Sequence, residues 1–299
     1  MSIGKWLQGN THSLAGKTVA ITGSTGGLGR ALCRHLAGLG ASLLLLDRNP
    51  ARQAALREEL IREFPKLDIQ LLQVDMEQMQ SVRTLCTELK ARQIDIFIHN
   101  AGAYAIPRHR CDTGFDNVFQ INFLSPYYII RELLPQLRAR HGHVVAVGSI
   151  AHKCRKSDPQ DPDFSTRKRD MHVYGNAKRY LIYALFALFE RERDITLSVA
   201  HPGICQTGIT SHYPRVIRML VKYPMRLIFM RPKKASLPTL YGVFCPCRGR
   251  EWIGPRVLDI WGLPRKKRLS SAPPEEAARM ASAAEEIYQR IKTEKSGSV

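Results

Sequence analysis

The sequence lacks the features that mark several large classes of protein. Its 299 residues contain no run of about 18 uninterrupted apolar residues, so we expect no membrane-spanning helix. The amino-terminal residues lack the apolar stretch of a secretory signal, so we expect a cytoplasmic protein. Glycine and proline occur at near-ordinary frequency, which argues against a chain dominated by disorder.

Cysteines are few, and they are scattered along the chain. Seven is an odd number, and the one close pair, Cys245 and Cys247, has no second pair of Cys or His residues nearby. We therefore expect no metal site. The cysteines are interpreted as reduced thiols in a reducing compartment.

Acidic residues are also scarce, because 26 of them face 45 basic residues and leave a net charge of +19. Such a field can attract nucleic acid, an anionic membrane or an acidic ligand. The basic residues spread over the whole chain, with local clusters at 167–169, 231–234 and 265–268. Clusters of this size are more often solvated faces than binding sites, so we expect no nucleic-acid partner. A basic module that binds a membrane surface stays open as an alternative.

Short apolar runs recur along the chain between segments with helical patterns. The runs are continuously apolar rather than alternating, which indicates strands buried on both faces and hence a parallel sheet. The predicted strands are residues 18–23, 41–47, 68–75, 94–100, 143–149 and 195–203, with a last edge strand at 256–262.

The segments between the strands predict helices that cover both faces of this sheet. They are residues 28–39, 50–64, 81–92, 113–140, 173–193 and 275–292, with Pro126 and Pro135 marking bends or limits in the fourth. The regular alternation predicts an α/β fold, a doubly wound parallel sheet in a single domain. We expect an amino-terminal arm at 1–12, a catalytic domain at 13–270 and a carboxy-terminal helix and tail at 271–299.

A glycine-rich loop, T-G-S-T-G-G-L-G at residues 22–29, closes the first predicted strand and opens a helix. Without Cβ atoms such a loop lets a pyrophosphate approach the backbone, and the helix N-terminus offers unpaired N–H groups. The glycines that set its spacing are Gly23, Gly27 and Gly29. The loop therefore predicts a dinucleotide site.

Asp47, at the end of the second predicted strand, bears on which dinucleotide binds. A carboxylate there can accept hydrogen bonds from the adenosine ribose hydroxyls and would repel a 2′-phosphate. Gly26 is not basic, so a common ligand of that phosphate is missing. We therefore predict NAD rather than NADP. Arg48 keeps NADP open if the Asp47 side chain turns away.

Tyr174 and Lys178 stand four residues apart in Y-G-N-A-K, so on a helix they share one face. Hydride transfer to or from a carbon that bears oxygen needs a group that moves the oxygen's proton. A free tyrosine has a pKa of about 10, and a nearby ammonium favours its phenolate. Ser149, at the end of the fifth predicted strand, could hold the substrate oxygen.

The order of these motifs resembles the short-chain dehydrogenase/reductase family, which has a single-domain Rossmann-type fold. The resemblance covers about residues 13–262 and includes H-N-A-G at 99–102 and P-G-x-x-x-T at 202–207. His99 replaces the first Asn of that motif, a change that affects a structural hydrogen bond and not the cofactor site. The resemblance implies a proton-relay tetrad of Asn122, Ser149, Tyr174 and Lys178.

The resemblance also implies the cofactor contacts, with the adenine near Asp75 and the nicotinamide carboxamide oriented by Thr207. The expected contacts are Gly23, Ser24, Gly26, Gly27, Leu28, Gly29, Asp47, Arg48, Asp75, Met76, Asn100, Ala101, Gly102, Tyr174, Lys178, Pro202, Gly203 and Thr207.

A polar insert at residues 152–172 lengthens the spacing between Ser149 and Tyr174. This length resembles the retinol dehydrogenase-like and WW-domain oxidoreductase-like branch, which implies a hydrophobic alcohol or carbonyl substrate such as a retinoid, steroid or lipid. Many members of that branch prefer NADP and carry an amino-terminal anchor, whereas this chain has Asp47 and we expect no anchor in it.

Residues 208–250 are expected to form a substrate lid. Within them, residues 212–230 suit a lid, simple packing or peripheral membrane contact. By resemblance we also expect a homo-oligomer. A non-catalytic, NAD-binding regulatory or scaffold protein of the same fold remains an alternative.

Overall fold

A computed structural model describes residues 2–204 and 229–294. These residues form one sheet with the strand order β3-β2-β1-β4-β5-β6-β7-β8, in which β1 to β7 run parallel and β8 is antiparallel to β7. The strands are β1 (Thr18–Thr22), β2 (Ser42–Asp47), β3 (Ile69–Gln73), β4 (Ile96–His99), β5 (His143–Val147), β6 (Thr196–Ala200), β7 (Glu251–Val257) and β8 (Trp261–Arg268). The predicted doubly wound α/β fold is confirmed.

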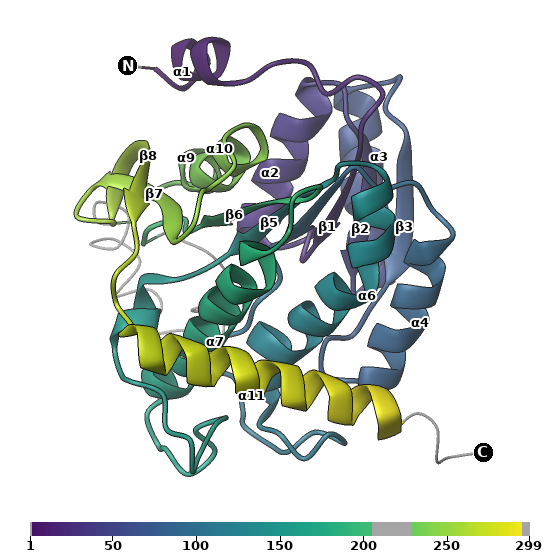
Figure 1. Cartoon of the computed structure of the whole chain (residues 1–299). Helices are drawn as coiled ribbons and strands as arrows, with labels where there is room; N and C mark the ends of the chain where they lie inside the picture. The colour runs from purple at the N-terminus through teal and green to yellow at the C-terminus, as the bar shows by residue number, and fades with distance from the viewer. Residues whose placement is uncertain (1, 205–228, 295–299) are drawn as a thin grey trace, which may run out of the picture.

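Apolar side chains on both faces of the strands explain why the sheet is buried. In β1, Ala20 points into one core, while Val19 and Ile21 point into the other. Helices α4 (Met79–Lys90), α6 (Ser125–Ala139), α7 (Asp170–Glu190) and α11 (Pro274–Thr293) cover the first face, and α2 (Gly27–Gly38), α3 (Pro50–Glu63) and α10 (Leu237–Phe244) cover the second (Figure 1). Each fully buried Leu or Ile contributes about 1.5–3 kcal/mol.

The strand order reverses between β1 and β4, which pair with each other although β2 and β3 intervene in the sequence. In open α/β sheets, ligands bind beyond the carboxyl ends of the strands at such a point. The glycine-rich loop follows β1 at this edge. The fold therefore puts the predicted dinucleotide site where the topology favours one.

The two ends of the chain are packed onto the domain. Residues 3–10, within the predicted amino-terminal arm, form α1 (Ile3–Asn10), and its buried Trp6 meets the Tyr241 ring edge-on with centroids 5.7 Å apart. At the other end, α11 crosses α7 (Figure 1) and buries Met280 and Ala284 in the core. The proposed boundaries at residues 12 and 270 stay predictions.

The predicted helical region 113–140 is divided into three parts. A short α5 (Asn117–Phe119) leads into a π-helical turn, η1 (Gln120–Leu124), and then into α6, which starts with Ser125 and Pro126. Pro135 is accommodated within α6. π-Helical turns are frequent at functional sites, and this one contains Asn122.

The prediction of a last strand at 256–262 is wrong. The middle of that stretch is the turn between β7 and β8, where Leu258 and Asp259 have φ values of 50° and 59°, outside the extended region of a regular strand. β7 begins earlier, at Glu251, and includes Gly254 and Pro255. The basic run in β8 resembled a solvated loop, although charged residues are common on edge strands.

Residues 205–228 lie outside the described part, so most of the segment 212–230 is not placed. The described remainder of the region 208–250 contains α9 (Pro232–Ala235), which contacts α2, and α10, which packs on β5 and β6. No helix among the described residues is long and apolar enough to cross a membrane.

Candidate active site

The glycine-rich loop forms a cradle between the end of β1 and the start of α2. Gly23 has a φ of 65°, and a Cβ atom at this position would lie 2.8 Å from the Ala101 Cα. Gly26 precedes the helix without any side-chain cap, so the first N–H groups of α2 remain available to an anion. The Ser24 Oγ is buried without a hydrogen-bond partner among the described residues, as expected if a bound group completes this site.

The H-N-A-G segment is fastened to the end of β1. Thr22 Oγ1 accepts hydrogen bonds from the backbone N–H groups of Asn100 and Ala101, both at 3.0 Å. Its own proton can then be donated to His99 Nδ1, 3.3 Å away. Burial, together with the charge of Lys178, holds the pKa of His99 well below its ordinary value, so the ring is neutral. His99 therefore keeps a hydrogen bond at this position.

Asp47 is fixed by the glycine-rich loop itself. Its Oδ2 accepts hydrogen bonds from the Thr25 N–H at 2.9 Å and the Thr25 hydroxyl at 2.8 Å, and its Oδ1 accepts one from the Arg48 N–H at 2.9 Å. The Arg48 guanidinium is largely exposed, and it lies 3.8 Å from Glu77. The carboxylate thus faces the loop, and the arginine side chain extends toward solvent.

Asp75 and Met76 follow β3 at the same edge of the sheet. Asp75 Oδ1 accepts a hydrogen bond from the Glu77 N–H at 3.0 Å, and Met76 is buried, its carbonyl bonded to the Ser125 hydroxyl at 2.6 Å. The backbone N–H of Val74 donates to the Asp47 carbonyl. Both predicted adenine-side residues therefore lie beside the strand that carries Asp47.

Tyr174 and Lys178 lie on α7, as predicted, with the Lys178 Nζ 5.9 Å from the centre of the Tyr174 ring. The ammonium donates a 3.0 Å hydrogen bond to the Val147 carbonyl, which ends β5. Burial lowers the pKa of Lys178 to about 7. Gly175 allows the close approach of this helix, because a Cβ atom there would lie 2.4 Å from the Ala151 carbonyl oxygen.

Ser149 and Asn122 come from two other elements that meet at this edge. Ser149 begins the 3₁₀ turn η2 (Ile150–Lys153), where its Oγ accepts a 3.2 Å hydrogen bond from the Ala151 N–H. Asn122 is fully buried and donates to the carbonyls of Ala103 and Val118, both at 2.8 Å. A Cβ atom on Gly102 would lie 2.9 Å from the Asn122 Oδ1 and 3.5 Å from the Lys178 Nζ. The fold thus brings all four predicted catalytic positions to one edge of the sheet.

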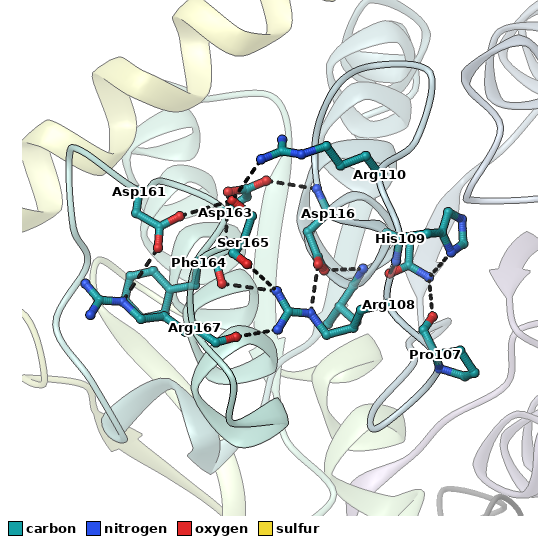
Figure 2. A network of polar contacts seen from close by, with 12 residues as sticks. Pro107, Arg108, His109, Arg110, Asp116, Asp161, Asp163, Phe164, Ser165 and Arg167 are labelled. Carbon is teal, nitrogen blue, oxygen red and sulfur yellow. Dashed lines mark hydrogen bonds and ion pairs between the residues drawn. The ribbon is translucent and has the colours of Figure 1, made fainter.

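The insert at 152–172 is folded onto the domain rather than left in solvent. Figure 2 shows Arg108 at the centre of its contacts, with hydrogen bonds to Asp116 at 2.8 Å and to the Phe164 and Ser165 carbonyls at 3.2 and 3.1 Å. The Asp116 N–H in turn donates to Asp163 at 2.8 Å. This polar clamp holds the insert against the loop before α5.

Beneath this clamp lies a small apolar cluster that reaches the candidate catalytic tyrosine. Phe164 from the insert is buried with Val118 and Val173, and Ile106 and Tyr174 pack against them. The Tyr104 ring meets the Tyr174 ring edge-on at a centroid distance of 5.3 Å. Apolar and aromatic side chains therefore pack against the Tyr174 ring.

The remaining predicted cofactor contacts come from the segment after β6. Pro202 and Gly203 follow that strand, and the Gly203 N–H donates to His201 Nδ1 at 3.0 Å. Leu28 of the loop lies in a buried cluster with Val147 and Met230. Thr207 lies outside the described residues.

Sequence reasoning missed several residues that support the site. Thr22 and Thr25 carry the hydrogen bonds described above, and their place inside the glycine-rich motif was the available signal. Arg179, next to Lys178, is buried and forms an ion pair of 2.7 Å with Glu276 of α11. An arginine directly before the apolar run of α7 was a signal, but its partner stands 97 positions away.

Comparisons with known proteins agree with this arrangement. The sequence model of the short chain dehydrogenase family matches residues 17–215. The chain is 32% identical to the short chain dehydrogenase resG of Aspergillus sclerotiorum over 66% of its length and 64% of that protein. It is 30% identical to retinol dehydrogenase 14 of Mus musculus, over 78% of this chain and 75% of that one. Among solved structures, an uncharacterized protein from Mycobacterium paratuberculosis matches with a TM-score of 0.73 and 23% identity, over 94% of this chain and 96% of that one.

Proposed function

We propose that this chain, which belongs to the retinol dehydrogenase-like branch of the short-chain dehydrogenase family, acts on a hydrophobic, lipid-like alcohol or its carbonyl product. Membership of this family makes it an NAD(P)-dependent oxidoreductase acting on CH–OH groups. Tyr174 would exchange the proton of the substrate oxygen. The observation that carries this assignment is the buried Lys178, held on the Val147 carbonyl beside Tyr174 at the edge where Ser149 and Asn122 also lie.

Each catalytic role follows from a contact of the chain's own residues. The Lys178 ammonium stabilises negative charge on the Tyr174 oxygen, which lowers the cost of proton transfer. The Ser149 hydroxyl holds the substrate oxygen, as its half-buried place before η2 allows. Asn122 fixes the loop after β4 through Ala103, and thereby the wall next to Lys178. A bound nicotinamide would supply the hydride acceptor or donor.

The residues at the glycine-rich loop fit a dinucleotide, and we propose NAD over NADP. The two hydrogen bonds from Thr25 hold the Asp47 carboxylate in place, so it is not free to turn away from a 2′-phosphate. Arg48 is the one basic residue of the predicted set near this carboxylate, and its side chain points to Glu77. This arrangement supports a site that accepts ribose hydroxyls and repels a phosphate.

Two observations support a hydrophobic substrate. Phe164, Val118, Val173 and Ile106 form an apolar cluster against Tyr174. The chain is also similar to a protein named retinol dehydrogenase 14. A homo-oligomer remains a prediction.

A coupled assay with NAD(H) and NADP(H) in parallel, on a panel of retinoid, steroid and long-chain alcohols and ketones, tests this proposal. We expect turnover with NAD(H) and a loss of about 10²–10⁴-fold in Tyr174→Phe. Asp47→Ser should shift the preference toward NADP(H), whereas Asp75→Ser, at the adenine side, should not. Tight NAD binding without turnover on any substrate would instead favour the non-catalytic alternative.

A further inference from the structure

Exposed apolar side chains gather at one place on the described surface. Four large apolar residues are exposed in the part of the chain that the structure describes, and three of them, Val257, Leu258 and Trp261, form the tip of the β7–β8 hairpin. Leu258 is 78% exposed and Val257 49%. We call these three residues the hairpin tip. Exposed apolar residues that cluster mark interaction sites more often than single ones do.

The backbone conformation of the tip is energetically unfavourable for a leucine. Leu258 has a φ of 50°, in the left-handed region that glycine and asparagine adopt easily and leucine does not. Its side chain, being mostly in water, contributes little to the folded core that could offset this strain. Strain of this kind is concentrated at functional sites, so a binding role is the physical reason that remains for an apolar residue here.

The turn that contains Leu258 is fixed by contacts of the next residue, Asp259. Asp259 accepts a 2.6 Å hydrogen bond from Lys267 of β8 and lies 3.5 Å from Lys153 of η2. Lys267 also donates to the Pro255 carbonyl at 3.0 Å. The strained tip is thus fixed in position between two strands and the insert, rather than left to relax.

Basic residues surround the tip. Arg256 directly precedes it and is exposed, as is Arg265 on β8. Lys153, tied to Asp259, is followed by the exposed Arg155 and Lys156. We call Arg256, Arg265 and Lys153 the basic collar. An apolar tip with basic residues beside it suits the surface of a lipid bilayer, which has anionic head groups outside and apolar acyl chains inside. The net charge of +19 would attract the chain to such a surface.

Two other partners fit this tip less well. A nucleic acid would use the basic collar but gains nothing from a protruding leucine. A second copy of the chain, docked through the same tip about a two-fold axis, would bring the two collars of like charge together.

We propose that the hairpin tip binds an anionic lipid surface. Leu258, Val257 and Trp261 enter the boundary between head groups and acyl chains, and the collar of Arg256, Arg265 and Lys153 contacts the lipid phosphates. This surface differs from the segment 212–230 discussed from the sequence, since it is made of β7, β8 and η2.

The tip lies next to the candidate active site. The carbonyl oxygen of Ile260, within the turn, is 2.4 Å from where a Cβ atom of Gly203 would stand. Lys153, which reaches Asp259, ends the η2 turn that Ser149 begins. Docking would therefore bring the edge with Ser149 and Gly203 near the lipid. Entry of a lipid-dissolved substrate at this edge rests on the proposed function, but lipid binding does not.

Vesicle binding by the full chain, without cofactor or substrate, tests the proposal. Vesicles of phosphatidylcholine with about one third phosphatidylserine are compared with pure phosphatidylcholine, by sedimentation and by tryptophan emission. Of the three tryptophans, Trp6 and Trp252 are buried and Trp261 is exposed. We therefore expect a blue shift that comes from Trp261, disappears in Trp261→Phe, and weakens as salt is added.

Leu258→Asn is the decisive variant, because asparagine accepts the left-handed backbone. It should raise the melting temperature yet weaken binding to anionic vesicles by about ten-fold or more. The matched control is His141→Asn, at another exposed position with a φ of 48°, which should leave vesicle binding unchanged. Arg256→Gln should weaken binding by about five-fold at low salt.

Several results would overturn this assignment. They are the absence of vesicle binding, equal binding to neutral vesicles, or undiminished binding by Leu258→Asn. Dimerisation lost in Leu258→Asn would show that the tip binds a second copy instead. None of these outcomes bears on turnover of soluble alcohols, so the proposed function is judged separately.

Discussion

Two adjacent residues of α7, Lys178 and Arg179, carry buried positive charges, and the protein surrounds them in opposite ways. Each is 2% exposed. Lys178 donates to the Val147 carbonyl and, among the described residues, forms no ion pair with a carboxylate. Arg179 forms two hydrogen bonds with Glu276, at 2.8 and 2.7 Å, and one each with the carbonyls of His152 and Ser271.

This difference in pairing indicates that Arg179 has a structural role and Lys178 a chemical one. Arg179 and Glu276 join α7, the insert and α11, and the Ser157 N–H and hydroxyl also donate to Glu276. Burial alone would raise the pKa of Glu276, but the hydrogen bonds from Arg179 and Ser157 outweigh it and lower that pKa below its ordinary value. A charge so well paired fixes the insert beside Tyr174. The sparsely paired Lys178 lowers stability and remains available to the site.

The largest expected effect is on turnover when the sparsely paired charge is removed. Lys178→Met should lower kcat/KM by about 10²–10⁴-fold, because no ammonium then stabilises the Tyr174 oxygen. Arg179→Lys, which keeps a charge at the neighbouring position, should stay within about ten-fold of the parent. The comparison would fail if Lys178→Met retained more activity than Arg179→Lys in the coupled NAD(H) assay.

The next largest effect is on stability when the well-paired charge is removed. Arg179→Met leaves the Glu276 carboxylate buried without its main partner and should lower the free energy of unfolding by about 3–5 kcal/mol. Replacing both partners, as Arg179→Met with Glu276→Met, should recover part of that loss, since no buried charge remains. Urea unfolding of the two single variants and the double variant measures this. A double variant less stable than either single one would contradict the interpretation.

The two charges should also act in different pH ranges. The pKa of Lys178 falls from 10.5 to about 7 on folding, so between these values the unfolded chain binds more protons. The free energy of unfolding should therefore rise with pH across that range, with the full penalty present below pH 7. Lys178→Met lacks this slope and should be more stable than the parent below pH 7, by a margin that shrinks toward pH 10. Parallel slopes for the two proteins would show that Lys178 is not the cause.

Glu276 contributes at the opposite end of the pH scale. Its pKa in the folded protein lies below the ordinary 4.5, so its stabilisation is present above that value and is lost as the pH falls further. Glu276→Gln should flatten this acid limb of the stability profile and leave the slope above pH 7 unchanged, although stability there is lower because Arg179 loses its charged partner. Urea unfolding between about pH 3 and pH 6 measures it.

The parts of the molecule that the sequence predicts well are those set by local patterns. Continuous apolar runs predict β1, β2, β4, β5 and β6, because strands buried on both faces need apolar residues at nearly every position. The edge strand β3 is predicted as well, although its Gln70 and Gln73 are exposed. The glycine-rich loop, Asp47, Ser149 and the pair on α7 also lie where their order suggests. Parallel strands place their carboxyl ends at one edge, so the order of motifs along the chain becomes proximity in space.

The features that sequence reasoning misplaced depend on distant partners or on unusual backbone. The β7–β8 hairpin turns through Leu258, a residue whose propensity gives no sign of a left-handed conformation. The π-turn around Asn122 looks like ordinary helix in sequence. Arg179 finds Glu276 only because α11 crosses α7, which no local pattern reveals (Figure 1).

The smallest expected effect concerns the link between Glu276 and the insert. Ser157→Ala removes a 3.1 Å hydrogen bond to the carboxylate but keeps the backbone N–H at 2.8 Å and both bonds from Arg179. It should therefore lower the free energy of unfolding by only about 1 kcal/mol, and hydrogen exchange should accelerate in residues 154–160 and not in α7. Ser165→Ala, whose hydroxyl has two longer bonds of 3.3 and 3.4 Å, is the matched control and should cost less. A loss in Ser157→Ala as large as that of Arg179→Met would mean that the insert, rather than α7, holds Glu276, and the contrast between the two buried cations would then need another explanation.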